Sequence, residues 1–290
     1  MSFDISIVTV CYNSASTIER TIRSVFFQSE TYSGTVQYVV IDGGSKDGTV
    51  ELVASLACEA PTNVVMELAS ERDNGIYDAM NKGLSKANGR FIGIINSDDE
   101  YLPNVFATMT QVMNDNPSAE LVHADVYWRY SMSGMPDKFS LWQGTENLGQ
   151  LSKGMSVNHP TVFCRTTLYQ REGVFDTSFK YVADWDWALR ISQRGVRFLY
   201  VPQPWVVFDM GGVSNKFLWR RYAEILRVHS KLRDSGMIGI STFISSSFKL
   251  FLEICVSFLY TKTVPKACRE KLRYERRRDE QLAIPVRGIL

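Results

Sequence analysis

Acidic residues in this sequence come directly after short apolar runs, an arrangement that can bind a cation together with a phosphorylated ligand. The adjacent pair Asp98 and Asp99 follows the apolar run 91–95, and Asp42 follows the run 38–41. Two neighbouring carboxylates repel each other unless a cation or a proton lies between them. Short oxygen-bearing side chains in a loop suit Mg²⁺ or Mn²⁺, particularly when diphosphate oxygens complete the coordination. The alternative interpretation of the pair is a solvated turn or the N-cap of the next helix.

Other phosphate-binding and hydrolytic chemistries lack their motifs. A dinucleotide fold needs G-x-G-x-x-G after the first strand, but the sequence there is CYNSAS, from Cys11 to Ser16. The segment GGSKDG (43–48) has the length of a P-loop, yet Thr49 and Val50 follow it instead of Lys and Ser or Thr. No G-x-S-x-G elbow of an α/β-hydrolase occurs. A sugar nucleotidyltransferase is disfavoured because CYNSAS is not a glycine-rich loop.

The elements that would position these residues alternate along the first hundred positions. β-Branched or apolar runs at 5–10, 38–41, 64–68 and 91–95 are separated by segments with helical periodicity. Such alternation predicts βαβ units and a parallel sheet, whose strands all end at one edge. We therefore expect one crevice to collect the polar residues that follow the strands, namely Tyr12, Asn13, Asp42, Asp73, Asp98 and Asp99.

The second part of the chain has a mixed pattern. Helices are expected at 105–113 and 185–192, and strands at 121–128, 162–164 and 197–201, with a polar, glycine-containing stretch reaching about residue 155. The chain as a whole has 290 residues, 45% apolar and 22% charged. This balance excludes a disordered chain, and a mean hydropathy of −0.12 excludes a polytopic membrane protein.

Charge and cysteine content add two expectations. The net charge of +1 conceals an asymmetry, because residues 216–290 hold 16 Lys and Arg against 7 Asp and Glu, whereas residues 1–215 hold 16 against 24. An acidic body with a basic tail suggests two tasks. Five scattered cysteines and no secretory leader favour a reducing, cytoplasmic setting.

Five motifs follow one another along the chain, namely VTVCYNSASTIERTI (8–22), VVIDGGSKDGT (39–49), SERDNGIYDAMNKGLSKANGRFIGIINSDDEYLP (70–103), NHPTVFCRTTLYQREGVFDTSFKYVADWDWALRI (158–191) and FDMGGVSN (208–215). Their sequences and order resemble the family 2 glycosyltransferases with the GT-A fold, and the last two resemble a bacterial subgroup for exopolysaccharide, colanic-acid-type and O-antigen synthesis. The resemblance implies an α/β fold with a mostly parallel, Rossmann-like sheet flanked by helices. It implies a catalytic domain over 1–215, with a nucleotide-sugar half (1–100) and an acceptor half (101–215), followed by a basic helical extension (216–290).

The resemblance also assigns donor-side roles. Thr9 and Tyr12 would line the base pocket, Asp42 would accept a hydrogen bond from a base, typically uracil, and Asp73 would contact the nucleoside and sugar. Asn96-Ser97-Asp98 occupies the place of the metal-binding DxD motif, with Asn96 replacing its first Asp. Asp98 would bind Mn²⁺ or Mg²⁺, with Asp99 as the next candidate.

On the acceptor side, the resemblance makes Asp184 the catalytic base, although Ala183 departs from the usual preceding acid. Asp184 could instead only cap a helix N-terminus. Asp186, Trp185 and His159 are further candidates, for which structural roles are the alternative. Gly211–Ser214 is expected to form a flexible loop over the site, and a simple turn is the alternative.

The tail carries an amphipathic pattern. Ile244, Phe248, Phe251, Leu252, Cys255, Phe258 and Leu259 share one helical face within 238–260, and Lys262 to Arg278 follow with many basic residues. This predicts peripheral binding to an anionic membrane, at the inner face of the plasma membrane, rather than a spanning helix. Packing on the body or on a second subunit, as in a homo-oligomer, is the alternative, and no nucleic-acid module is expected.

The sequence thus favours an inverting transfer of a sugar from a nucleotide-diphosphate donor, by family habit a UDP-sugar, to a saccharide or polyprenyl-diphosphate-linked acceptor. A metal would neutralise the departing diphosphate while Asp184 takes the acceptor proton. The alternative is a non-catalytic nucleotide-sugar-binding protein with the same body.

Overall fold

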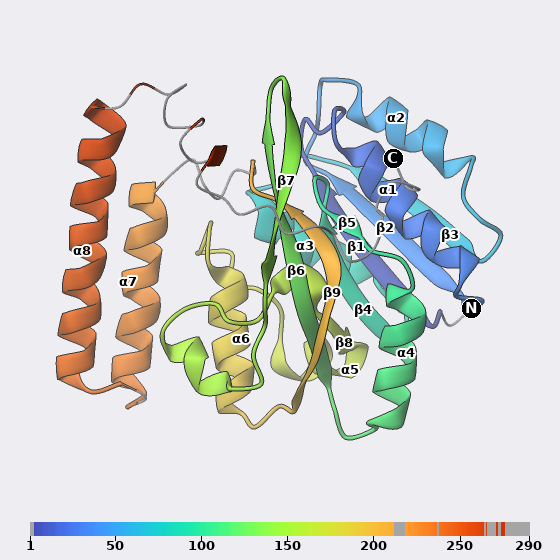
Figure 1. Cartoon of the computed structure of the whole chain (residues 1–290). Helices are drawn as coiled ribbons and strands as arrows, with labels where there is room; N and C mark the ends of the chain where they lie inside the picture. Colours follow the sequence, from blue (N-terminus) through green and yellow to red (C-terminus); the bar gives the residue numbers. More distant parts are fainter. Residues whose placement is uncertain are drawn as a thin grey trace.

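The computed structural model describes residues 3–211, 218–236 and 238–263, together with 265, 271, 274 and 275 (Figure 1). Strands and helices alternate over the first hundred residues, as the sequence predicted. They are β1 (Ile5–Cys11), α1 (Ile18–Phe27), a short 3-10 turn η1 (Gln28–Glu30), β2 (Val36–Asp42), α2 (Thr49–Ala57), β3 (Val64–Ser70), α3 (Ile76–Lys86) and β4 (Phe91–Asn96).

The remainder of the chain is mixed, again as predicted. It contains β5 (Glu100–Tyr101), α4 (Val105–Asp115), β6 (Leu121–Met132), β7 (Met135–Trp142), the 3-10 turns η2 (Leu148–Ser152) and η3 (His159–Thr161), β8 (Phe163–Arg165), α5 (Thr166–Glu172), α6 (Ala183–Gln193), β9 (Phe198–Asp209), α7 (Leu218–Asp234) and α8 (Ile240–Thr263).

A single sheet connects these strands in the order β3-β2-β1-β4-β8-β6-β9-β5, with β7 paired to β6. The first four strands are parallel, and their register brings their ends level. Cys11 pairs with Asp42, Val10 with Asn96, and Asp42 with Ser70. The predicted common edge for the polar loops after β1, β2, β3 and β4 is therefore confirmed.

Two apolar layers hold the helices on the sheet. Every residue of β1 and β2 is buried, because helices cover both faces of these strands. One layer joins residues of α1, α2 and α4 with one face of the sheet, and the other joins residues of α3, α5, α6 and α7 with the opposite face. The order helix, sheet, helix confirms the mostly parallel α/β fold.

The hairpin of β6 and β7 was not expected from the sequence. β7 lies within the stretch predicted as a polar loop, because none of its residues is buried and it lacks an apolar run. The tip of the hairpin extends beyond the other strands in Figure 1. β9 is also longer than predicted, since Pro204 is accommodated where the register between β6 and β9 shifts near Asp125.

The C-terminal extension begins with a helix that belongs to the body. Val228 and Leu232 of α7 are buried in the same layer as α6. The carboxylate of Glu224 accepts hydrogen bonds from the main-chain amides of Lys180 (2.7 Å) and Tyr181 (2.8 Å), directly before α6. The predicted domain boundary near residue 215 therefore precedes a helix with buried polar contacts to the acceptor half.

Helix α8 is different, because it packs along α7 at the outside of the molecule (Figure 1). Phe243 packs against the core, whereas Ile240, Ile244, Phe248, Leu252 and Val256 are exposed. None of the helices in the described ranges is long and apolar enough to span a bilayer. The side chains of Phe251, Phe258 and Leu259 and most of the basic segment that follows lie outside the described residues.

Candidate active site

A cleft of about 640 Å³ lies at the ends of the first three strands. Its lining residues come from the loops after β1, β2 and β3, and they are Tyr12, Gly43, Gly44, Lys46, Arg72 and Asp73. The Tyr12 side chain is 64% exposed, so one face of its ring is available to a ligand. The structure thus brings together two predicted donor residues, Tyr12 and Asp73, and adds the cations Lys46 and Arg72, to which the sequence analysis gave no role.

Asp42 lies beneath this cleft rather than in its lining. One carboxylate oxygen accepts hydrogen bonds from the amides of Gly44 (3.0 Å) and Ser45 (2.9 Å) and from the hydroxyl of Ser70 (2.7 Å), and the other accepts from the Ser45 hydroxyl. Burial opposes ionisation of Asp42, but the hydrogen bonds from Ser45 and Ser70 outweigh it and lower the pKa. In this structure the Asp42 carboxylate therefore shapes the turn under the cleft.

Gly43 lines the cleft at a position that has no room for a side chain. A Cβ at this position would lie 2.4 Å from Oδ2 of Asp73 and 3.3 Å from the Tyr12 ring. The absence of a side chain lets the two cleft residues approach the main chain closely. Thr9, in contrast, is fully buried in β1 and its hydroxyl contacts that of Tyr38 (3.1 Å), so it supports the strand rather than lining the cleft.

The acidic turn after β4 contains two carboxylates in different environments. Asp99 is fully buried, and its two oxygens accept hydrogen bonds from the Asp209 amide (2.9 Å) and the Asn96 side chain (3.1 Å). Asp98 is partly exposed. Burial raises the pKa of both carboxyls, with added repulsion from Asp209 on Asp98 and from Asp98 on Asp99. Asp98 is therefore the better placed of the two to meet a ligand, and Asp99 braces the turn.

The donor atoms at this turn suit a divalent cation. Besides the carboxylates, Oδ1 of Asn96 is buried and makes no hydrogen bond within the described residues. A carboxylate and an amide oxygen match the oxygen preference of Mg²⁺ and Mn²⁺. Across the described part of the chain, no cluster of three or more His, Cys, Asp or Glu side chains could hold a metal. Ligand or water oxygens would therefore have to complete the coordination.

Asp184, the predicted base, lies in the first turn of α6 and is partly buried. Its Oδ1 accepts a hydrogen bond from the hydroxyl of Tyr77 (2.9 Å) and one from the Trp185 amide (2.9 Å). Tyr77 belongs to α3, only four residues after Asp73 in the cleft lining. This hydrogen bond connects the predicted base with the segment that forms the donor cleft, a partner that no motif assigned.

The remaining acceptor-side candidates have structural contacts. His159 packs edge-on against Phe175, and burial lowers its pKa although Asp184 opposes the shift. The carboxylate of Asp186 is buried and pairs with Lys231 of α7 at 2.5 Å. The Trp185 indole is buried and donates to the Leu151 carbonyl at 2.7 Å. Of these three residues, Trp185 contacts Asp184 through its main-chain amide, and His159 lies close enough for the charge of Asp184 to act on it.

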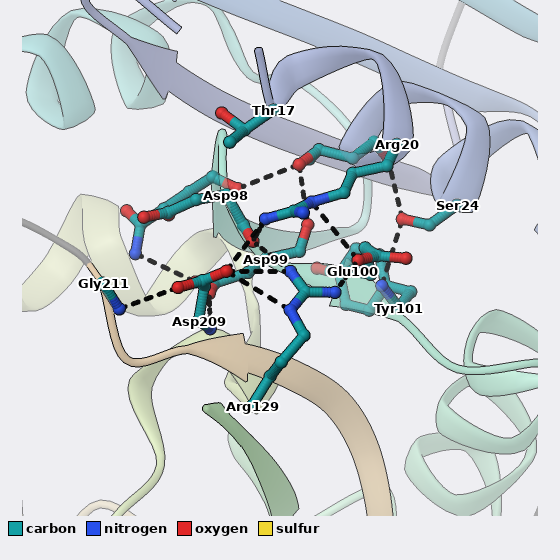
Figure 2. A network of polar contacts seen from close by, with 12 residues as sticks. Thr17, Arg20, Ser24, Asp98, Asp99, Glu100, Tyr101, Arg129, Asp209 and Gly211 are labelled. Carbon is teal, nitrogen blue, oxygen red and sulfur yellow. Dashed lines mark hydrogen bonds and ion pairs between the residues drawn. The ribbon is translucent and has the colours of Figure 1, made fainter. Parts of the chain in front are cut away.

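A buried ionic network surrounds the acidic turn, and the sequence analysis assigned it no role (Figure 2). Arg129 of β6 pairs with Glu100 and donates to the Asp209 carboxylate and the Asp98 carbonyl. Arg20 of α1 contacts the same three groups. Asp209 is the last residue of β9, and its Oδ1 accepts from the Gly211 amide. Residues 212–217, with the rest of the predicted glycine loop, lie outside the described residues.

Comparison with known proteins defines the class of this fold and site. The profile described as Glycosyl transferase family 2 matches residues 6–171, and the chain belongs to this family. It is 25% identical over 234 residues to a PGL/p-HBAD biosynthesis glycosyltransferase of Mycobacterium bovis, covering 78% of this chain and 85% of that protein. The chain is thus a glycosyltransferase, as the motifs predicted.

Solved structures confirm the GT-A-like fold. S. aureus TarS 1-349 in complex with UDP-GlcNAc aligns with a TM-score of 0.63 and 14% identity over 87% of this chain and 72% of that one. The mannosyltransferase PcManGT from Pyrobaculum calidifontis, in complex with GDP-Man and Mn²⁺, aligns with a TM-score of 0.62 and 16% identity over 94% and 79%. At these identities the likeness concerns the fold.

Proposed function

We propose that the chain is an inverting, metal-dependent glycosyltransferase that uses a nucleotide-diphosphate sugar, namely a UDP-sugar, in the synthesis of a cell-surface glycan. The observation that carries the proposal is the cleft lined by Tyr12 and Asp73, linked through Tyr77 to Asp184. The UDP-GlcNAc complex of TarS and the GDP-Man complex of PcManGT, which share the fold, support a nucleotide-sugar donor.

The proposed donor site divides its tasks among the residues of the cleft. The exposed Tyr12 ring would stack on the nucleobase, and Asp73 would accept hydrogen bonds from the nucleoside or sugar. Lys46 and Arg72 are cations that can offset diphosphate charge. Asp98 and Asn96 would hold Mn²⁺ or Mg²⁺, which when bound neutralises charge on the departing diphosphate.

Asp184 would act as the general base. It would accept the proton of the acceptor hydroxyl as that oxygen attacks the anomeric carbon, and one such displacement inverts the configuration. The hydrogen bond from Tyr77 holds Oδ1 of Asp184 in place. The acceptor in this proposal is a saccharide or a polyprenyl-diphosphate-linked oligosaccharide.

A panel of UDP-, GDP- and dTDP-sugars with Mn²⁺ tests donor binding by thermal shift, because a ligand that binds only the folded state raises the melting temperature. We expect one nucleotide class to stabilise the protein. Release of the nucleotide from that donor would then be compared for the wild type and Asp184→Asn. Undiminished release by the variant would refute the assignment of the base, and a wild type that binds but never turns over would favour the non-catalytic alternative.

For the extension, we propose peripheral contact of α8 with an anionic membrane, at the inner face of the plasma membrane. The exposed stripe Ile240, Ile244, Phe248, Leu252 and Val256 supplies apolar side chains at four-residue spacing. The excess of Lys and Arg after residue 261 complements anionic lipid. This stripe differs from the predicted one in two ways. It includes Ile240 and Val256, and it does not include Cys255, which is half-buried rather than exposed.

Sedimentation with phosphatidylcholine vesicles, with and without 30% phosphatidylglycerol, tests this contact (the lipid fraction is about that of an anionic leaflet). The double variant Ile244→Ser and Phe248→Ser should lose binding to the anionic vesicles. Val65→Ser, which removes an exposed apolar side chain of β3, is the matched control and should bind like the wild type. Equal binding by the double variant would exclude the stripe, and a wild-type dimer that the double variant dissociates would identify a second copy as its partner.

A further inference from the structure

The main-chain carbonyl of Asp98 is held by two guanidinium groups from distant parts of the chain. Nη2 of Arg20 and Nη2 of Arg129 each lie 3.2 Å from this oxygen. Arg20 comes from α1 in the donor half, and Arg129 comes from β6 in the acceptor half. The peptide that carries the candidate metal ligand is thus fixed from both sides (Figure 2).

The two arginines are themselves fixed by two carboxylates. Oδ2 of Asp209 lies 3.0 Å from Arg20 and 3.1 Å from Arg129, and Glu100 pairs with both arginines. The side chains of Arg129 and Glu100 are only 3% and 2% exposed. Two cations and two anions pair within the network, and the Asp98 carboxylate forms no direct ion pair with any of the described residues.

The network depends on the planar guanidinium group of Arg129. Its three nitrogens reach three different groups, namely Glu100, the Asp98 carbonyl and Asp209. A lysine ammonium at this position would keep the charge but not the planar, multidentate geometry. Asp209 extends the connection, because its amide donates to Asp99 and its Oδ1 accepts from Gly211.

We infer that Arg129, together with Arg20 and Asp209, is a positioning group that presets the Asp98 turn for the metal and diphosphate and links this turn to the end of β9. The inference rests on the proposed function, because it assigns the metal site to Asp98. Arg20, Arg129 and Asp209 are not among the residues that line the cleft. It acts by restricting the main chain that carries Asp98, so that less conformational freedom is lost when a cation binds.

The decisive variant is Arg129→Lys, with Arg165→Lys as its matched control. Arg165 is also a partly buried arginine that donates to three carbonyls, those of Ala119, Met113 and Pro117, but at the end of α4. Binding of Mn²⁺ is followed by the loss of its free electron paramagnetic resonance signal in the presence of UDP, and UDP binding by calorimetry with Mn²⁺. Both substitutions should lower the melting temperature, but only Arg129→Lys should weaken Mn²⁺ binding, by about tenfold.

Mn²⁺ affinity of Arg129→Lys within twofold of the wild type, or an equal loss in Arg165→Lys, would overturn the inference. If Arg129→Lys fails to fold, Arg20→Lys at the 26% exposed position and Asp209→Asn test the same contacts. A wild type without Mn²⁺-dependent UDP binding would contradict the proposed function itself. If the wild type shows Mn²⁺-dependent UDP binding and the variants bind Mn²⁺ equally well, only the positioning role would be contradicted.

Discussion

The proposed donor edge and the proposed acceptor side of this molecule use their polar residues in opposite ways. At the donor edge, buried side chains such as Asp42 and Asp99 hold the main chain of the loops, and Tyr12 and Asp73 line an open cleft. On the acceptor side, the buried Trp185 indole donates to the Leu151 carbonyl, and the Asp186 carboxylate pairs with Lys231 of α7. The donor site is therefore built by local loops, whereas the acceptor side depends on elements far along the chain.

This difference indicates where specificity can change independently. The loops after three parallel strands are held at one edge of the sheet by hydrogen bonds between residues about thirty positions apart, such as those of Asn13 with Ser45 and of Ser70 with Asp42. Asp184 of α6 instead contacts Tyr77 of α3 and interacts with His159 of η3, which lie 107 residues away and 25 residues away along the chain. We therefore expect substitutions at the two sides to separate donor binding from turnover.

The largest effect is expected at the acidic turn. Asp98→Asn removes the negative charge best placed to hold the cation, and should lower the rate of nucleotide release by at least about 1,000-fold and weaken binding of UDP with Mn²⁺. The measurements are steady-state rates and calorimetry. Asp115→Asn, at the exposed end of α4, is the control and should leave both unchanged.

The second largest effect should separate turnover from donor binding. Asp184→Asn should reduce turnover by about 100- to 1,000-fold and leave UDP affinity within twofold, because a general base contributes to the reaction and not to donor binding. Asp186→Asn, whose carboxylate pairs with Lys231, should mainly lower the melting temperature. Equal loss of turnover in both variants would mean that the two acids are not separated as the structure indicates.

Histidines should make the folded state less stable at acid pH, and they all lie after residue 100. The three histidines of the chain are His123, His159 and His229. Burial lowers the pKa of His123 to about 4. Between this value and the usual 6.5 the unfolded chain binds more protons, so stability is complete above pH 6.5 and falls as the pH drops toward 4.

At pH 5 this histidine alone should cost about 2 kcal/mol of unfolding free energy. His123→Phe keeps a ring against Tyr200, which lies 5.3 Å away, and removes the titration. Urea unfolding midpoints at pH 7 and pH 5 should then differ less in the variant than in the wild type. An unchanged difference would show that other groups cause the loss.

The smallest effect concerns the floor of the cleft. Gly43→Ala places a Cβ 2.4 Å from Oδ2 of Asp73, so this carboxylate must move, and UDP should bind about tenfold more weakly. Gly154→Ala adds a methyl group in open space and is the control. Equal affinity for UDP in the two variants would show that Asp73 tolerates displacement.

Local patterns predicted most of the strands and helices of both parts of the chain, but not the hairpin strand β7. The runs around Ile5–Cys11 and Val36–Asp42 are buried on both faces, so their strands and the loops after them were recognised from composition alone. β7 was missed because none of its side chains is buried, so its sequence has no apolar run. That Asp42 and Thr9 lie beneath the cleft was also invisible, since side-chain hydrogen bonds decide it.

The ionic network shows the same limit at longer range. Arg20, Glu100, Arg129 and Asp209 are separated by up to 189 residues, and no spacing along the chain connects them. Each residue taken singly resembles an ordinary surface charge in a sequence with 32 Lys and Arg and 31 Asp and Glu. Only the pairing of β6 with β9 brings Arg129 level with Asp209.

The two hydrogen bonds from the amides of Lys180 and Tyr181 to Glu224 have a practical consequence for shortening this protein. A deletion that starts at residue 216 removes Glu224, which accepts both hydrogen bonds. It also removes Val228 and Leu232, so the apolar residues of α6 in the same layer become exposed to solvent. A deletion that starts after Gly236 keeps α7 and removes α8. Soluble, active fragments for crystallisation should therefore end in the turn between these two helices.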